Sequence, residues 1–547
     1  MIKGDIIVRE IKIGKNVIEN LTRGMYEDSK IIYREYIQNA ADQIDCAAKH
    51  ELFDEDLFID IIIDKNGRNI TIKDNATGVK RDMIESTLAY VADSDKIKGE
   101  TKGFRGIGRL GGLAYCEKLR FITTAKGENQ KTIMTWDANA LSKMLDDEKV
   151  KDAAGTILQK IISYEFEECP LDDHYFIVEM LGITNENVDL LDTEKVKEYI
   201  ALNAPVPYDS KFYYKKKIHE YLEQKRLPKN EYKIFVDGED ILKLYTTSLF
   251  EKNSAGQRRK YDDIYDIEIQ EFYNDNEELL AWMWFGISRF EKQIAFPLNQ
   301  TAGIRLRQSN IKIGSERTLV PFFKEARGNL YFIGEVHAVH KELTPNARRD
   351  YFNENRVRND LEAQLKYFFH TRLHQLYNDA NRAKNAYKKE INLYKKEEDY
   401  IKKKGRFVSD REKQNLEQEI EAAKTEDEKA KRELQRLKSK AERDDVFYVI
   451  LKHIEDNHKK ILNDAGFLKL PSNPLTQPAL VEKPEKKKNG YLVNELSNLP
   501  DKQRKLVSRI YDIIARNLPP AQSEELINKI QEELKYGKKN SINRTKL

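Results

Sequence analysis

The sequence predicts an α+β protein, in which segments of strand character and short helices are followed by long helices in the C-terminal third. Alternating apolar residues at 58–64 and 69–74 flank Asn66-Gly67, a combination typical of a β-hairpin. Further runs of strand character recur as far as about residue 340. From about residue 356 the composition shifts to Glu, Lys and Arg with apolar residues in a near-heptad rhythm, which favours paired helices.

A helix expected over residues 21–50 carries the first chemical signal. Glu35, Asn39 and Asp42 share one face of this helix, and the opposite face holds isoleucines. An asparagine oxygen can ligate Mg²⁺, and a carboxylate one turn away can polarise a water for attack on a phosphate. A polar helix face is also common simply because it faces solvent, so the helix alone leaves both interpretations open.

Two glycine-containing segments follow this helix. Asp74 ends a strand shortly before Gly78, which places a carboxylate acceptor near backbone that carries no side chain. Gly103, Gly106 and Gly108 form G-x-x-G-x-G, a loop whose backbone N–H groups can approach phosphates. The spacing differs from the dinucleotide fingerprint, and no G-K-[ST] follows as in a P-loop. Taken singly, each segment is equally consistent with an ordinary turn or a flexible loop.

Together, the order E-x-x-x-N-A-x-D, D-N-x-x-G and G-x-x-G-x-G resembles the GHKL ATPases. This superfamily includes the ninety-kilodalton heat-shock chaperones, type II topoisomerase ATPase subunits, MutL and MORC proteins and sensor histidine kinases. Residues 21–45 are most similar to the chaperones, whereas KGFRG at 102–106 is closer to MutL. The sequence departs from the family at Ala76, where glycine is usual, and at Arg109, where the chaperones often carry an aromatic residue.

The resemblance implies a Bergerat fold over residues 1–165: a mixed sheet with helices on one face, ATP between helices and sheet, and a mobile lid. ATP and Mg²⁺ are the cofactors it implies. Glu35 would be the general base, Asn39 the Mg²⁺ ligand, and Asp74 the residue that binds the adenine amino group. Thr156 would belong to a strand that closes the adenine pocket. The other ATP-binding positions implied by the resemblance are Asp42, Gly78, Ser94, Lys96, Gly103, Phe104, Arg105, Gly106, Ile107 and Gly108.

Residues 166–355 are expected to form an α/β transducer domain. Residues 346–350 resemble the chaperone N-x-x-R-E element, near a helix expected to begin at Pro345. In those relatives the arginine reaches the γ-phosphate, and the matching residue here is Arg349. MutL-like relatives use an earlier lysine, for which Lys312 is the candidate, and the sequence leaves the choice open. The alternative is that these arginines pair with neighbouring acids on a surface helix.

The sequence of the remaining third of the chain predicts helices. A long antiparallel coiled-coil hairpin is expected over 356–469, interrupted at Gly405 and restarted by a capping box that begins at Ser409. Prolines and lysines at 470–490 indicate a linker. Residues 491–547 predict a small helical module that needs a partner surface, because so short a segment is marginal alone.

Composition narrows the function classes. The chain has 547 residues, 34% of them charged, and a formal net charge of +3, which argues against a uniformly basic DNA-coating surface. Three cysteines without paired spacing favour a reducing compartment. No signal peptide and no apolar run of membrane length is present in the sequence, so a cytoplasmic protein without a membrane partner is expected.

Two functions follow as expectations. The first is a chaperone-like, ATP-dependent conformational clamp, a homodimer that hydrolyses ATP with Mg²⁺ and acts on a protein client. The alternative is a MutL- or MORC-like ATPase that acts on DNA, as in bacterial defence against phage with a partner effector protein. The presence of Glu35 disfavours a scaffold that binds ATP without turnover. The salt dependence of DNA binding separates the first two.

Overall fold

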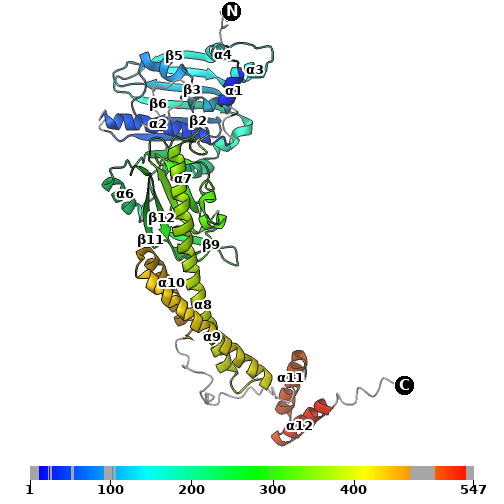
Figure 1. The fold of residues 1–547 in the computed structure, drawn as a ribbon. Coiled ribbons are helices and arrows are strands. Elements are labelled where there is room, and N and C mark those ends of the chain that lie inside the picture. Colours follow the sequence, from blue (N-terminus) through cyan, green and yellow to red (C-terminus); the bar gives the residue numbers. More distant parts are fainter. Residues whose placement is uncertain are drawn as a thin grey trace, which may run out of the picture. The chain divides into compact units, whose positions relative to one another are not determined.

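The chain divides into two compact units, Met1–Tyr377 and Asn378–Leu547 (Figure 1). The computed structural model describes residues 12–22, 24, 28–50, 55–91, 102, 106, 108–296, 298–467 and 499–536. Every strand in this described part lies in the first unit, and the second unit is helical there. The α+β class predicted from the sequence is therefore confirmed.

An eight-stranded sheet forms the N-terminal part of the first unit, in the order β5-β4-β3-β6-β2-β1-β7-β8. Its strands are β1 (Phe58–Asp64), β2 (Asn69–Asp74), β3 (Cys116–Thr124), β4 (Gln130–Asp137), β5 (Ile162–Glu168), β6 (Tyr175–Ile183), β7 (Lys233–Val236) and β8 (Glu239–Asp240). Neighbours are antiparallel except β1 and β7, which are parallel, so the sheet is mixed. The predicted hairpin at Asn66-Gly67 is present, with Ile61 opposite Ile72. Since β6, β7 and β8 follow residue 165, this sheet continues beyond the boundary expected for the ATP-binding domain.

Helices pack on this sheet, and α2 is the most buried of them. They are α1 (Asn16–Thr22), α2 (Ile31–Lys49), α3 (Ala138–Asp146), α4 (Ala154–Ile161) and α5 (Thr193–Asn203). Ile32, Ile37 and Ala41 of α2 have no exposed surface, and α2 contacts β1, β2 and α5. Its apolar stripe therefore fixes which face of the helix is left for polar side chains.

The segment Gly155-Thr156-Ile157, expected from the resemblance to belong to a strand, is helical. Helix α4 occupies Ala154–Ile161, and strand β5 begins only at Ile162. Ile157 and Ile161 lie one helical turn apart, and both are buried. This apolar spacing of four residues fits a helix rather than a strand, so the strand prediction is wrong here.

The first unit contains a second, five-stranded sheet, in the order β11-β12-β15-β13-β14. Its strands are β11 (Asp266–Tyr273), β12 (Leu279–Ile287), β13 (Gly303–Gln308), β14 (Ile311–Ile313) and β15 (Ile333–Ala338), and beside it lie the hairpin β9 (Ser248–Lys252) and β10 (Arg258–Asp263) and helix α6 (Lys215–Gln224). Helix α7 (Arg356–Phe368) contacts β11 and β12 (Figure 1). No helix begins at Pro345: the segment from Pro345 to Phe352 is a loop closed by a bridge between these two residues, and α7 starts only at Arg356.

Short 3₁₀ and π segments also belong to the first unit. The 3₁₀ turns are Arg81–Met83, Gly108–Ala114, Asn185–Leu191, Val320–Phe322 and Ala326–Tyr331, and the π turns are Glu85–Ala89 and Phe369–Leu373.

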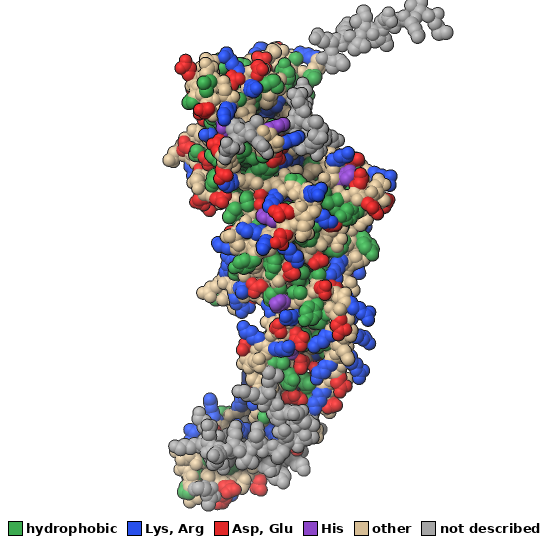
Figure 2. All heavy atoms as spheres, turned by 90° about the vertical axis from the view of Figure 1, so that its left-hand side faces the viewer, with side chains coloured by type: hydrophobic (Ala, Val, Ile, Leu, Met, Phe, Trp, Pro, Cys, Tyr) green, Lys and Arg blue, Asp and Glu red, His purple; other side chains and the backbone are tan. Residues whose placement is uncertain are grey.

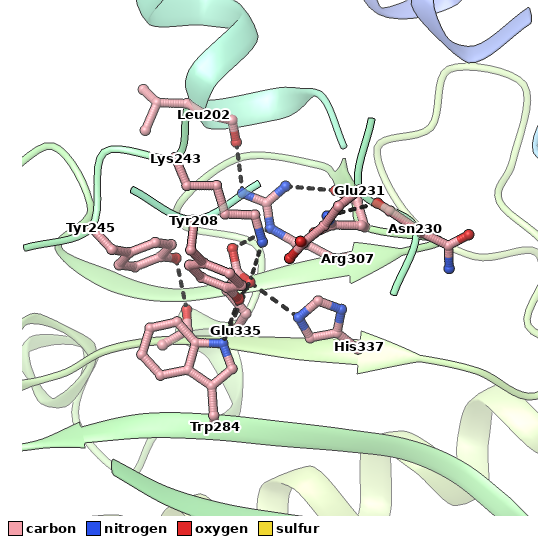
Figure 3. A network of polar contacts seen from close by, with 12 residues as sticks. Leu202, Tyr208, Asn230, Glu231, Lys243, Tyr245, Trp284, Arg307, Glu335 and His337 are labelled. Carbon is pink, nitrogen blue, oxygen red and sulfur yellow. Dashed lines mark hydrogen bonds and ion pairs between the residues drawn. The ribbon is translucent and has the colours of Figure 1, made fainter. Parts of the chain in front are cut away.

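A network of buried polar side chains ties the second sheet to the end of α5 (Figure 3). Glu335 of β15 is fully buried and accepts hydrogen bonds from the Tyr208 hydroxyl at 2.6 Å and the Lys243 ammonium at 2.8 Å. Arg307 of β13 donates to the same carboxylate and also to the Leu202 carbonyl, at 3.0 Å, near the end of α5. Burial lowers the pKa of Lys243 to about 7, although Glu335 beside it opposes this shift. Removing one partner from such a network would leave an uncompensated buried charge. Because each member needs the others, the network forms a rigid connection.

The second unit begins within a long helix. Its elements are α8 (His374–Lys403), α9 (Asp410–Ala441), α10 (Asp445–Asp464), α11 (Asp501–Asn517) and α12 (Pro520–Tyr536). Ion pairs join Lys396 to Glu419 and Arg382 to Glu433, so residues that come later on α8 meet residues that come earlier on α9. The two helices are therefore antiparallel. Ser409 caps α9 as predicted, since its Oγ accepts from the Glu412 N–H at 3.2 Å, while Glu412 Oε2 accepts from the neighbouring Val408 N–H at 2.9 Å.

Two expected segments relate differently to the structure. Residues 470–490, predicted as a linker, lie outside the described residues. Helix α7, included in the predicted hairpin, belongs instead to the first unit, which ends at Tyr377.

Candidate functional site

A cavity lies between α2 and the eight-stranded sheet. Residues of α2, of strands β2, β3 and β6, of the glycine loop and of the loop at 345–349 line it. Its empty volume, counted to the open mouth, is about 1160 Å³.

Asp74 and Gly78 form one end of the cavity. The Asp74 side chain, at the end of β2, is 3% exposed, and its Oδ1 accepts from the Ala76 N–H at 3.1 Å. Burial raises the pKa of Asp74 to about 7, although this backbone hydrogen bond and Lys73 oppose the rise. Gly78 has a φ of +62°, and a Cβ there would lie 1.8 Å from the Thr124 carbonyl oxygen. This end therefore offers one buried acceptor beside bare backbone, as an amino-substituted base requires.

Ala76 stands where the related ATPases usually carry glycine. It is fully buried, and among the described residues it is not one of the non-glycine positions with positive φ. Its backbone conformation therefore does not require glycine, which explains why alanine fits here.

Glu35 and Asn39 mark the other end of the cavity. Glu35 is 7% exposed, and its Oε1 accepts from the Arg34 guanidinium at 3.1 Å. A Cβ on Gly108 would lie 2.6 Å from Glu35 Oε2, so a side chain at this position would displace the carboxylate. Asn39 lines the same cavity one helical turn after Glu35. A carboxylate, an amide and a glycine backbone thus meet at one place.

Arg349 reaches this end from the loop between β15 and α7. Its Nε lies 3.7 Å from Glu35 Oε1, and its guanidinium donates to the Lys102 carbonyl. Its φ is +57°, a region that non-glycine residues seldom adopt, and its carbonyl accepts from the Gly314 N–H at 2.8 Å. The surrounding contacts therefore hold this loop in one conformation.

Lys312, the other candidate cation, does not line the cavity. It lies on β14 opposite Arg307 in the strand register. Burial lowers its pKa to about 7, and Arg305 and Arg307 lower it further, although Glu316 opposes this shift. Of the two cations that the sequence left open, the structure brings Arg349, and not Lys312, to the cavity beside Glu35.

The remaining residues expected to bind ATP divide into three groups. Gly106 and Gly108 line the cavity. Asp42 does not line it; its Oδ1 accepts from the Lys102 N–H at 2.9 Å and so anchors the start of the glycine loop. The positions that lie outside the described residues are Ser94, Lys96, Gly103, Phe104, Arg105 and Ile107.

The expectation for Thr156 is wrong. Its side chain is exposed on α4 and does not line the cavity. Strand β6 supplies that wall instead, through Phe176 and Val178, and Phe176 pairs with Asp74 in the register. The nearly continuous apolar sequence of β6 predicts a buried strand, but only the sheet order shows that it lies beside β2.

Sequence reasoning also missed Arg34 and Gln38, and it gave no role in the site to Asn346, the first residue of the N-x-x-R-E element. Arg34 holds Glu35, and Gln38 and Asn346 line the cavity. Gln38 follows Glu35 by three residues, so its place on the same helix face was visible in the sequence. The N-x-x-R-E pattern singles out the segment that contains Asn346, but only the fold shows that this residue lines the cavity.

Comparison with known proteins agrees with this geometry. Residues 28–174 match the family described as histidine kinase-, DNA gyrase B-, and HSP90-like ATPase. They therefore form an ATPase domain of the GHKL class with the Bergerat fold, which implies ATP binding and ATP hydrolysis.

The chain is also distantly similar to chaperone protein HtpG. It is 30% identical to HtpG of Buchnera aphidicola subsp. Baizongia pistaciae, over 28% of this chain and 28% of the relative. It is 24% identical to HtpG of Wigglesworthia glossinidia brevipalpis, over 49% of this chain and 40% of the relative. It is 29% identical to HtpG of Chromobacterium violaceum, over 26% of this chain and 25% of the relative. The matches thus span at most about two fifths of these relatives.

The part of the chain that the structure describes contains no helix with the length and apolar character needed to cross a bilayer.

Proposed function

We propose that this chain is an ATP-driven conformational clamp in which Glu35 and Arg349 act together on the γ-phosphate. The observation that carries the proposal is that a base on α2 and a cation from the loop after the second sheet lie 3.7 Å apart at one cavity. A positive charge supplied by a second part of the chain stabilises charge on the transferring phosphoryl group. A bound nucleotide would thereby contact residues from the part of the chain around each of the two sheets.

The residues present fit ATP and Mg²⁺. Asp74 accepts from the adenine amino group, and the bare backbone at Gly78 lets the base lie close to the wall. Asn39 offers the amide oxygen that Mg²⁺ prefers, and the bound ion neutralises phosphate charge. Glu35 takes a proton from the attacking water, and Arg34 and Arg349 hold its carboxylate in place.

Replacement of the base tests the proposal. Glu35→Gln keeps the shape of the side chain and removes its basicity, so we expect ATP to bind with Mg²⁺ while phosphate release falls by at least about a hundredfold. Calorimetry measures the first quantity and a phosphate-release assay the second. Glu19→Gln, an exposed acid on α1, is the matched control and should behave as wild type. Normal turnover in Glu35→Gln would remove Glu35 as the base.

We also propose a cytoplasmic homodimer that joins through α11 and α12. Leu506, Ile510 and Ile513 form one stripe of α11, and they are 60%, 40% and 59% exposed. The sequence gives α11 five basic and two acidic residues, and α12 two basic and four acidic residues. A two-fold axis brings α11 of one copy onto α12 of the other, which pairs unlike charges around the apolar stripe.

The described residues give less support to a DNA-acting machine. On the face shown in Figure 2, basic and acidic side chains are interspersed, without one extended basic field. In the α8–α9 hairpin, Lys396, Lys389 and Arg382 each pair with an acid of α9. Such cations are partly neutralised before any phosphate arrives, so a protein client fits better. DNA binding with a steep salt dependence would favour the alternative.

A further inference from the structure

Gln38 is a second polar side chain of α2 at the cavity, and the mechanism above does not use it. It follows Glu35 by three residues, so the two lie on neighbouring positions of one helix face. The side chain is 1% exposed and lines the cavity. Within the part of the chain that the structure describes, its Oε1 is buried and has no hydrogen-bond partner.

A buried carbonyl oxygen without a donor is unfavourable, and native proteins keep few of them. Where one borders a ligand cavity, the ligand or an ordered water can supply the missing donor. Gln43 shows the contrast on the same helix. It also lines the cavity, but its Oε1 accepts from the Thr77 hydroxyl at 2.7 Å. Thr77 therefore supplies a hydrogen-bond donor to Gln43 Oε1, whereas Gln38 Oε1 has no donor among the described residues.

The neighbours of Gln38 indicate where that donor arrives. Glu35 precedes it on α2, and Arg349 lies 3.7 Å from Glu35. Asp42, one turn after Gln38, anchors Lys102 at the start of the glycine loop. Asp74, the acceptor proposed for adenine, lies instead on β2 near Gly78. Gln38 therefore belongs to the end of the cavity where phosphates and the attacking water would lie.

We propose that Gln38 is a positioning residue for the water that attacks ATP, which deepens the function proposed for Glu35 and rests on it. The water donates one O–H to Glu35 and the other to Gln38 Oε1, which points its lone pair at the γ-phosphorus. A bond forms between the water oxygen and this phosphorus, and the bond to the bridging oxygen breaks. ADP leaves with that electron pair, Glu35 takes the proton, and the proton then passes to solvent. Orienting the nucleophile is a recurring part of phosphoryl-transfer sites.

Gln38→Leu keeps the approximate volume of the side chain and removes the acceptor. We expect kcat to fall on the order of 10- to 100-fold, because a misplaced nucleophile loses its near-attack geometry. The Kd of ATP, measured by calorimetry with Mg²⁺, should change less than about twofold, because only the transition state loses a contact. The melting temperature without nucleotide should equal or exceed that of wild type, because an unsatisfied buried oxygen is removed.

Two further variants separate positioning from structure. Gln38→Glu keeps an acceptor oxygen and should retain more kcat than Gln38→Leu, a rescue that a purely structural role does not predict. Gln43→Leu is the matched control, a glutamine of the same helix whose oxygen is satisfied by Thr77; its loss should fall mainly in KM.

The role of Gln38 and the ATPase function can fail separately. If Gln38→Leu turns over at the wild-type rate while Glu35→Gln does not, Gln38 has no positioning role and the ATPase assignment stands. A loss of ATP affinity as large as the loss of turnover would make Gln38 a binding residue and also overturn the proposal. A wild-type protein that does not hydrolyse ATP would remove both.

Discussion

Asp74 combines a carboxylate with deep burial, and this costs stability in the absence of nucleotide. Its native pKa of about 7 lies above its unfolded value of 3.8, so the folded chain holds this proton more tightly. The contribution of Asp74 to the free energy of unfolding is therefore most favourable below about pH 4, and it is lost as pH rises toward 7. A residue kept at such a cost is typical of a binding site.

We therefore expect Asp74→Asn to stabilise the protein without nucleotide. The gain should be near zero at pH 4 and reach at most about 4 kcal/mol at pH 8, because asparagine carries no charge to bury. Thermal unfolding across this pH range measures it. A variant that is destabilised at pH 8 would show that the Asp74 carboxylate is stabilised by the fold rather than strained by it.

The two glutamines of α2 show which features of single residues the sequence predicts and which it does not. Helical periodicity places Gln38 and Gln43 near Glu35 and Asn39. It does not show that Thr77 satisfies Gln43 while Gln38 Oε1 stays unpaired among the described residues, because these contacts depend on how β2 and its turn pack against the helix.

Among the elements, strands and caps with strong local signals are predictable. The hairpin β1–β2, with its Asn-Gly turn, and the helix cap at Ser409 have the predicted form because turn and cap chemistry act within a few residues. Helix α4 was missed because the family resemblance outweighed the helical spacing of Ile157 and Ile161. The loop that carries Arg349 was predicted as a helix. The prediction failed because the contacts of this loop come from Gly314 and Lys102, which are far away in sequence.

That loop makes a specific prediction. Arg349→Ala should lower kcat by about 10- to 1,000-fold and leave the Kd of ATP within about threefold, because the cation acts on charge that develops in the transition state. Single-turnover phosphate release and calorimetry give the two quantities. Arg348→Ala, an exposed neighbour, is the control. Unchanged turnover in Arg349→Ala would exclude Arg349 from the chemistry and reopen the case for Lys312.

At the scale of the whole molecule, the first unit connects its ATP site to its second sheet by two routes. Arg349 joins the loop after β15 to Glu35, and Arg307 joins β13 to the end of α5, which itself contacts α2. The class of fold was predictable from the sequence, but these routes were not, because both join residues that are distant along the chain.

The proposed homodimer gives a prediction at the same scale. Ile510→Asp places a charge on the exposed stripe of α11, so the mass in solution should fall from that of a dimer to that of a monomer. Light scattering, with and without a non-hydrolysable ATP analogue, measures it. Tyr213→Asp, a change at an exposed aromatic residue of the first unit, is the control. A wild-type protein that is monomeric under both conditions would contradict the homodimer.

The most direct measurement is equilibrium binding of labelled ATP, with Mg²⁺, to the wild-type chain and to Asp74→Asn. We expect one ATP per wild-type chain and at least about a hundredfold weaker binding to the variant, because an amide –NH₂ would meet the adenine amino group where an acceptor is needed. Equal binding by both proteins would show that ATP does not occupy the cavity as proposed. No ATP uptake by the wild-type protein would contradict the account as a whole.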